Sequence, residues 1–144
     1  MEPMLIVQHF KKIVNFKLSE IAKNNNLSIN EILILSYLYY SNKNLATNIT
    51  NDLGFTKSHV SLSINLLKKK GFIEKVRDTT NKKNIHIKLK QKAGDIVKQV
   101  LLEKENLFNK IKYNISDSDW VQFVTTLSKI EKNLKGMIKK DENI

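Results

Sequence analysis

Apolar residues recur every three or four positions over residues 3–24, a spacing that predicts an amphipathic helix ending at the polar run Asn24–Asn26. Ser28 and Glu31 follow as a capping box, in which the Ser hydroxyl accepts from a backbone amide and the Glu carboxylate accepts in return. The next helix, which contains EILILSYLYYSN, is apolar on almost every side. Because a helix of this kind is normally buried, we expect it to form the spine of the domain.

Two short helices and a β-hairpin are predicted in the middle of the chain. The segment LATNITNDL is a short helix that ends at Gly54, which supplies the left-handed conformation common after a helix C-terminus. Thr56 caps the following helix, and Gly71 ends it. The apolar period then changes to two, which predicts strands over residues 72–77 and 84–90 around the polar turn DTTNKK. The second strand places on its buried face Ile85, Ile87 and Leu89, and on its other face His86, Lys88 and Lys90.

Two long helices are predicted to finish the chain, over residues 93–111 and from the capping pair Ser116 and Asp119 to Ile138. The apolar stripe of the last helix continues over three heptads, so it packs either on the preceding helix or on a second chain. We favour a second chain, because both chain ends supply long apolar stripes. The dimer contacts predicted in this way are Ile6, Phe10, Ile13, Trp120, Phe123, Leu127, Ile130, Leu134 and Met137.

Length and composition fit one mostly helical domain with a small β-hairpin wing. The chain has 144 residues with four Gly and one Pro, so long loops are not expected. We therefore predict a winged helix-turn-helix in a single domain, 1–144. Residues 28–90, approximately, form its central lobe, and residues 1–25 and 91–144 form N- and C-terminal dimerisation helices.

The basic charge is concentrated in one third of the chain. Of the 25 basic residues, 24 are Lys, a bias that an AT-rich genome would produce without any functional cause. Residues 43–90 nevertheless have a net charge of +8, whereas the other 96 residues have +3. Genome composition alone does not explain this asymmetry, which indicates a basic face for a polyanion.

The two helices around Gly54 have the spacing of a helix-turn-helix. Thr50 is small where the second helix approaches, and Val60 packs back between the helices. In this geometry the start of the second helix enters the major groove, and the hairpin tip lies near the minor groove or its phosphates. The lysines Lys68–Lys70 either contact phosphates or favour the helix C-terminus through its dipole. Predicted DNA contacts are Thr56, Lys57, Ser58, His59, Ser61, Asn65, Lys68, Lys69, Arg77, Lys82, Lys83 and Asn84.

The order of elements and the segments LATNITNDLGFTKSHVS and GFIEKVRDTTNKKNIHIKL resemble the multiple-antibiotic-resistance regulator (MarR) family of bacterial winged-helix repressors. The resemblance covers nearly the whole chain, and Asp78 takes the position of a characteristic acid of the family's wing. It implies a homodimer joined by its terminal helices that binds a pseudo-palindromic operator on double-stranded DNA. It also implies, as in many members, release by a small-molecule effector bound between the two lobes.

The wing departs from the family pattern at two positions. The family usually has a second Asp and an Arg where this chain has Asn81 and Lys83, so an acid-to-guanidinium brace becomes an amide and an ammonium. Many members also have Arg where this chain has Leu62. Sequence recognition is therefore expected to depend on Lys57, His59 and Ser61.

The sequence has few features of an enzyme or of a metal-binding protein. An enzyme is not indicated, because there is no Gly-rich phosphate loop, no Cys and no His-x-x-x-His motif. The three His residues lack metal-ligand spacing, so neither a metal nor a cofactor is expected. Two alternatives remain open, namely a sequence-independent architectural DNA-binding protein and a helical interaction module.

The apolar segments and the aromatic residues bear on localisation and on ligand binding. The N-terminal segment lacks the features of a signal peptide, and the apolar run Ile32–Leu35 is far shorter than the roughly 18 residues that span a bilayer, so we expect a cytoplasmic protein without membrane contact. Aromatic residues that could line a ligand cleft are equally suited to the core, which we favour: Phe10, Phe16, Tyr37, Tyr40 and Trp120.

Overall fold

The computed structural model describes residues 1–141. It divides into two compact units, Met1–Lys104 and Glu105–Ile144. The first unit holds the winged helix-turn-helix that the sequence predicts, and the second holds the last helix and the end of the helix before it. Residues 142–144, which the predicted domain includes, lie outside the described residues.

The first two helices begin and end where local sequence predicts. Helix α1 spans Pro3–Asn24, and helix α2 spans Ile29–Tyr40. The capping box between them is confirmed, since the Glu31 amide donates to Ser28 Oγ at 3.1 Å and the Ser28 amide donates to Glu31 Oε1 at 3.1 Å. Each bond satisfies a backbone amide that the helix itself leaves without a partner.

The helix-turn-helix consists of α3, Ala46–Leu53, and α4, Lys57–Lys69. Gly54 has φ of +67°, the left-handed conformation predicted for the turn, and a side chain there would be strained. Thr56 caps α4 as predicted, with its Oγ1 accepting from the His59 amide at 3.2 Å. These two local features fix the sharp change of direction between the helices.

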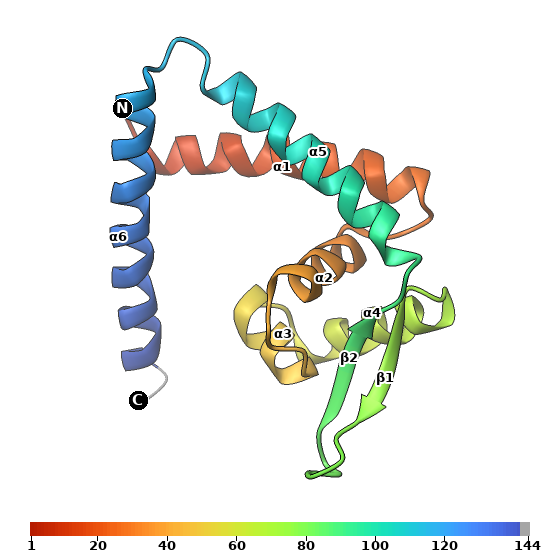
Figure 1. Cartoon of the computed structure of the whole chain (residues 1–144). Coiled ribbons are helices and arrows are strands. Elements are labelled where there is room, and N and C mark those ends of the chain that lie inside the picture. The colour runs from red at the N-terminus through yellow and green to blue at the C-terminus, as the bar shows by residue number, and fades with distance from the viewer. Residues whose placement is uncertain (142–144) are drawn as a thin grey trace. The chain divides into compact units, whose positions relative to one another are not determined.

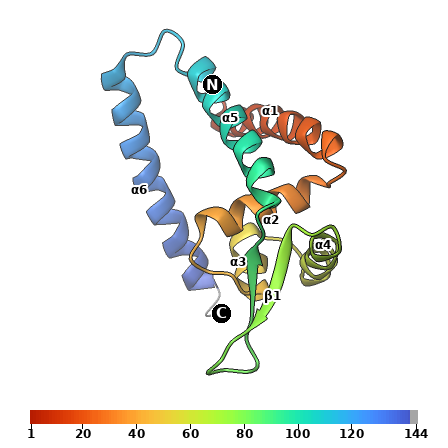
Figure 2. The ribbon, with the colours of Figure 1, turned by 45° about the vertical axis from the view of Figure 1, so that its right-hand side comes forward.

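The wing is an antiparallel hairpin of β1, Ile73–Arg77, and β2, Ile85–Leu89, in which Lys75 pairs with Ile87. Its turn projects beyond the helices α2, α3 and α4 (Figures 1 and 2). The predicted burial of Ile85 is wrong, because its side chain is 42% exposed. Ile85 pairs with Arg77 at the end of the hairpin next to the turn, whereas the buried Ile87 lies nearer its base.

The hydrophobic core lies in the first unit, around α2, α4 and the base of the hairpin. The predicted burial of α2 holds for its first half, where Ile32, Ile34 and Leu35 are fully buried, whereas Tyr39 and Tyr40 at its end are exposed. The other main contributors to the core are Ile49, Val60, Ile64, Leu67, Phe72, Ile73, Ile87, Ala93, Ile96 and Val97. Burial of each large aliphatic side chain contributes about 2 kcal/mol relative to exposure.

One buried charge ties α2 to the end of α4. The side chain of Glu31 is 3% exposed, and its Oε2 lies 2.9 Å from Lys70 Nζ. Lys70 Nζ also donates to the Asn26 carbonyl at 2.9 Å. Lys70 therefore stabilises the fold, whereas the side chains of the neighbouring Lys68 and Lys69 are exposed.

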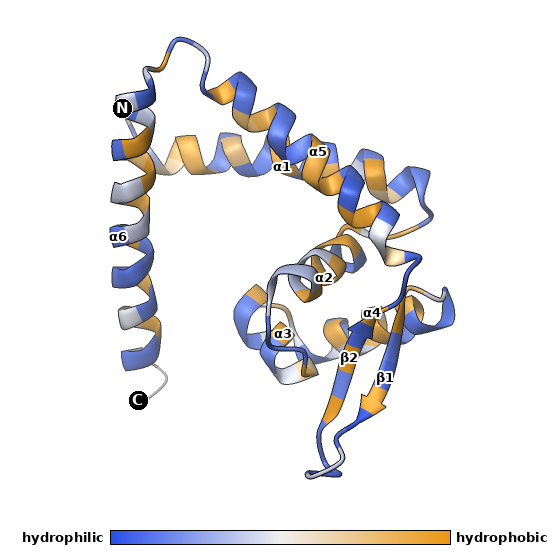
Figure 3. Cartoon of the chain, in the orientation of Figure 1, coloured by the Kyte–Doolittle hydropathy of each residue, from blue (hydrophilic) through white to orange (hydrophobic). Residues whose placement is uncertain are grey.

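Helix α5, Ala93–Ile111, crosses the boundary between the units, and helix α6 spans Asp117–Asp141. In the second unit the Trp120 ring stacks edge-on against Phe108 at 6.0 Å between centroids. From Val121 to Lys140 every residue of α6 is exposed, including its apolar stripe (Figure 3).

The first half of α1 is exposed as well, with an apolar stripe of its own. The preference for core positions is therefore wrong for Phe10, Phe16 and Tyr40, which are 43%, 61% and 57% exposed. Tyr37 is partly buried, and its hydroxyl donates to Asp52 Oδ2 at 2.6 Å. Burial, together with this hydrogen bond, raises the pKa of Tyr37.

Candidate nucleic-acid interface

The start of α4 presents polar side chains to solvent. The predicted residues Lys57, Ser58, His59 and Ser61 are all exposed, while Val60 between them is buried against the core. The cap explains this arrangement, because it fixes the first turn of the helix and thereby the direction of each side chain.

Helical geometry divides these residues between two sides of α4. Lys57, Ser61 and Asn65 are spaced four residues apart, so they lie along one side. His59 is two residues from Lys57 and thus about 160° away from it around the axis. The structure therefore brings Lys57 and Ser61 together but places His59 elsewhere on the helix.

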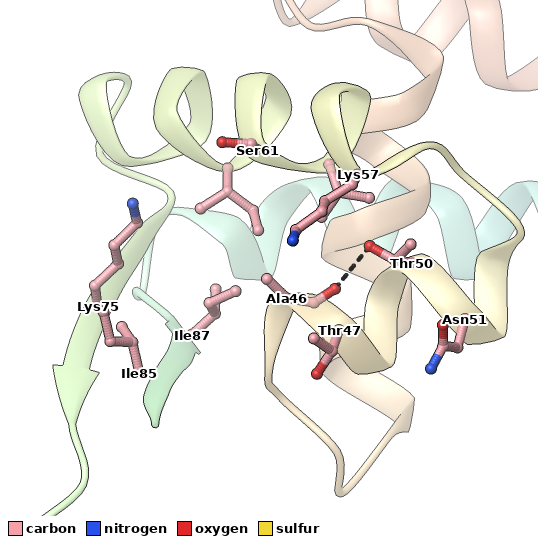
Figure 4. A pocket seen from close by; sticks show the side chains of 11 residues that line it. Ala46, Thr47, Thr50, Asn51, Lys57, Ser61, Lys75, Ile85 and Ile87 are labelled. Atoms are coloured by element: carbon pink, nitrogen blue, oxygen red, sulfur yellow. Dashed lines mark hydrogen bonds between the residues drawn. The ribbon is translucent and has the colours of Figure 1, made fainter. Parts of the chain in front are cut away.

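A groove of about 430 Å³ lies between α3, α4 and the hairpin. Its floor is apolar, with Val60, Ile64 and Ile87, and its edges include Lys57 and Ser61 from α4. Figure 4 shows Lys57 and Lys75 extending into the groove from α4 and β1. The remaining lining residues are Ala46, Thr47, Thr50, Asn51 and Ile85.

Lys75 is a groove residue that the sequence prediction missed. Its Nζ donates to Asn65 Oδ1 at 2.9 Å, so it links β1 to the predicted contact face of α4. The signal was a Lys at an inward position of the strand, two residues after the buried Ile73. A Lys side chain can cover apolar surface with its stem and keep its ammonium in water, which suits this position.

The wing turn is shaped by Asp78. Its Oδ1 accepts from the Thr80 amide at 2.8 Å, the Thr80 hydroxyl at 2.9 Å and the Asn81 amide at 3.3 Å. The turn then carries Lys82 and Lys83, which are exposed as the prediction requires. The structure therefore fixes the backbone that presents the two ammonium groups.

A histidine of the second strand braces Asp78. His86 Nε2 lies 2.8 Å from Asp78 Oδ2, and His86 Nδ1 lies 2.6 Å from Asn44 Oδ1. The hydrogen bond from His86, followed by those from Thr80 and Asn81, holds the pKa of Asp78 well below its usual range. Sequence reasoning missed Asn44 and the role of His86, because their contact joins residues 42 positions apart.

The other predicted contacts fall at the edges of this surface. Arg77 is exposed at the end of β1. Asn84 is partly buried, and its backbone closes the turn by accepting from the Asp78 amide and donating to the Asn81 carbonyl.

Two other types of site were sought across residues 1–141. Within that range no group of three or more His, Asp or Glu residues could hold a metal ion. Over the same residues, every helix is either too short or too polar to cross a bilayer.

Comparison with known families identifies the chain by its central part. A family model described as "Transcriptional regulator SarA/Rot" matches residues 17–100, more than half of the chain. The HTH-type transcriptional regulator SarU of Staphylococcus aureus (strain COL) is 34% identical over 79 residues, which cover 54% of this chain and 32% of SarU. The chain therefore spans about a third of the length of this curated relative.

Solved structures share the fold. A MarR family protein from Bacillus stearothermophilus has a TM-score of 0.77 at 17% identity, covering 92% of both chains. S. aureus MepR in its DNA complex has a TM-score of 0.73 at 16% identity, covering 92% of this chain and 98% of MepR. At these identities the similarity establishes a MarR-like winged-helix fold.

Proposed function

The chain belongs to the SarA/Rot family of transcriptional regulators, and from this membership we propose that it binds double-stranded DNA as a homodimer and represses the genes beside its operator. The observation that carries the proposal is the polar, basic side of α4, bordered by Lys57 and Ser61, next to a wing whose turn holds Lys82 and Lys83. This pairing provides a helix for the major groove and a cationic tip for the adjacent backbone. The fold shared with MepR, which is solved as a DNA complex, supports it.

The same proposal assigns DNA binding to the middle of the chain and dimerisation to its ends. Residues 28–90, approximately, bind DNA, and residues 1–25 and 91–144 join two chains. The exposed apolar stripes of α1 and α6 support this assignment. A twofold dimer presents its α4 helices to half-sites one helical turn apart, so the operator should be pseudo-palindromic.

Base recognition and backbone contact are assigned to different lysines. Lys57 lies at the start of α4, from which side chains reach base edges, whereas Lys69 lies near its end, beside phosphates. We expect Lys57→Ala to weaken binding to the operator more than binding to a scrambled duplex. Lys69→Ala should weaken both alike and lower the salt slope of binding by roughly one.

The experiment first selects bound fragments from the host genome and then measures affinity by fluorescence anisotropy across salt concentrations. Specific repression predicts that tight binding to one site survives at about 200 mM salt, where binding to the scrambled duplex is largely lost. Equal loss on both duplexes would favour an architectural DNA-binding protein. A protein that is not retained by DNA at low salt would leave the helical interaction module as the better account.

We also propose that a small molecule regulates DNA binding. The resemblance to the MarR family implies an effector that releases DNA. Release of the selected operator by small molecules extracted from the host tests this part directly, with the scrambled duplex as the control.

A further inference from the structure

His86 lies between the wing and the loop that precedes α3. Its Nε2 faces Asp78 Oδ2 at 2.8 Å, and its Nδ1 faces Asn44 Oδ1 at 2.6 Å. A neutral imidazole donates from one nitrogen, whereas an imidazolium donates from both. Because both nitrogens of His86 face oxygen atoms, the protonated ring satisfies this geometry best.

The two ends of this hydrogen-bonded chain reach different parts of the lobe. At one end, Asp78 organises the turn that presents Lys82 and Lys83. At the other end, Asn44 is fixed by its backbone, since its carbonyl accepts from the Ile87 amide at 2.9 Å. The His86 ring thus connects the cationic tip to the entry of the helix-turn-helix.

We propose that protonated His86 is a positioning residue that sets the wing against the helix-turn-helix, so that DNA affinity falls as the ring loses its proton. The inference rests on the proposed DNA-binding function. The imidazolium donates a charge-assisted bond to Asp78 and a second bond to Asn44, whereas the neutral ring keeps only one donor. The brace is therefore complete while the ring carries its second proton and weakens when that proton is lost at higher pH.

The other charged groups around the His86 ring are carboxylates and ammonium groups. Asp78 faces it from the turn and stays ionised, because its hydrogen bonds keep its pKa low. Glu74 and Lys88 form the neighbouring cross-strand pair on the same face of the hairpin, and Lys43 precedes Asn44 in the loop. Carboxylates and ammonium groups ordinarily keep their charges between pH 6 and 8.

The test combines a spectroscopic titration with DNA binding. The ¹⁵N shifts of the His86 ring, followed in the full chain without DNA, report its protonation and tautomer from pH 5 to 9. Affinity for a defined random-sequence duplex is measured at pH 6 and pH 8, at one fixed salt concentration. All proteins compared in this way carry His59→Gln, so that no histidine of the predicted DNA-binding set contributes to the pH dependence.

The decisive comparison is between that background protein and the same protein with His86→Gln, which keeps an amide donor but does not titrate. We expect the background protein to lose about fivefold more affinity than the His86→Gln variant between pH 6 and 8, because the charge-assisted bond to Asp78 is lost with the ring proton. His9→Gln, on α1, is the matched control and should leave the pH dependence unchanged. Urea unfolding of each variant confirms that the lobe is folded.

Two results would overturn the inference: a ring that is neutral at pH 6, with Asn44 donating to it through its amide, or an equal pH dependence with and without His86. A natural protein, with His59 in place, that binds no duplex at either pH contradicts the proposed function and with it the link to affinity. In that case the ¹⁵N titration still decides whether the ring is the charged brace, so the two failures are distinguishable.

Discussion

The winged-helix lobe and helix α6 have the same kind of apolar spacing, but only the lobe buries it within one chain. Leu67 of α4 is fully buried, whereas Leu127 and Leu134 of α6 are 45% and 52% exposed. The core around the lobe draws on the hairpin and on helices α1 to α5, whereas in the second unit α6 contacts the end of α5 through Trp120 and Phe108. An amphipathic stripe thus predicts that a face is to be covered, without indicating which chain covers it.

This difference divides the molecule by function. The lobe buries its core within one chain and carries the residues that we propose contact DNA. Helix α6 and the first half of α1 expose stripes that a second copy can cover, and covering them would duplicate the lobe.

The largest expected effect is on association. Leu127→Glu places a charge in the middle of the α6 stripe, at a site that a symmetric dimer buries twice. We expect self-association to weaken by about a thousandfold, because each buried charge lacks a partner. Sedimentation equilibrium measures the change.

Lys129→Gln is the matched control for this variant. It shifts the net charge by the same unit on the opposite side of α6, and it should leave association nearly unchanged. Equal effects of the two substitutions would show that the stripe is not an interface.

The next largest effect is a difference between the two regions in the free energy of unfolding. In the Leu127→Glu background, where association does not contribute, Leu67→Ala should lower the free energy of unfolding by about 3 kcal/mol because it opens a cavity in the core. Leu134→Ala should change it by less than about 0.5 kcal/mol, since that side chain is half exposed. Urea denaturation distinguishes the two, and similar losses would mean that α6 is covered within the chain.

A smaller effect concerns the buried carboxylate of the lobe. Lys70→Met keeps the aliphatic stem but leaves Glu31, with a side chain only 3% exposed, without its cation. We expect a loss of about 2 kcal/mol, less than for a fully buried pair because Lys70 is 29% exposed. Lys69→Met is the control at the adjacent exposed position and should be almost neutral in urea unfolding.

The smallest effect is expected in acid, at the wing. The pKa of Asp78 is lower in the folded chain than in the unfolded chain, so its stabilising contribution is present above the unfolded value and is lost as the pH falls towards the folded one. The difference in urea midpoint between the natural chain and Asp78→Asn should be constant between about pH 5 and 6 and shrink below about pH 4. A difference as large at pH 2 as at pH 5 would contradict the hydrogen-bonded carboxylate.

Features set by neighbouring residues could be predicted from the sequence. The capping box of Ser28 and Glu31, the left-handed Gly54 and the Thr56 cap are all confirmed, because each depends on a contact within three residues or on one backbone angle. The element order follows from apolar periods that hold over whole helices and strands.

Contacts between distant parts of the chain could not be predicted. The partners of Lys70, Lys75 and His86 are 39, 10 and 42 residues away, and a sequence pattern does not specify which side chains meet after folding. Three lysines in a row at the end of α4 looked equivalent, yet only Lys70 reaches Glu31. The burial expected for Phe10 and Phe16 failed for a related reason, since periodicity does not identify the surface that covers a stripe.

The central claim is that one chain completes the DNA-binding lobe and two chains complete the terminal helices. The mass of the natural protein in dilute solution, measured by sedimentation equilibrium at micromolar concentration, tests it most directly. The account predicts twice the chain mass of 16.7 kDa, whereas a species that remains at 16.7 kDa would contradict it.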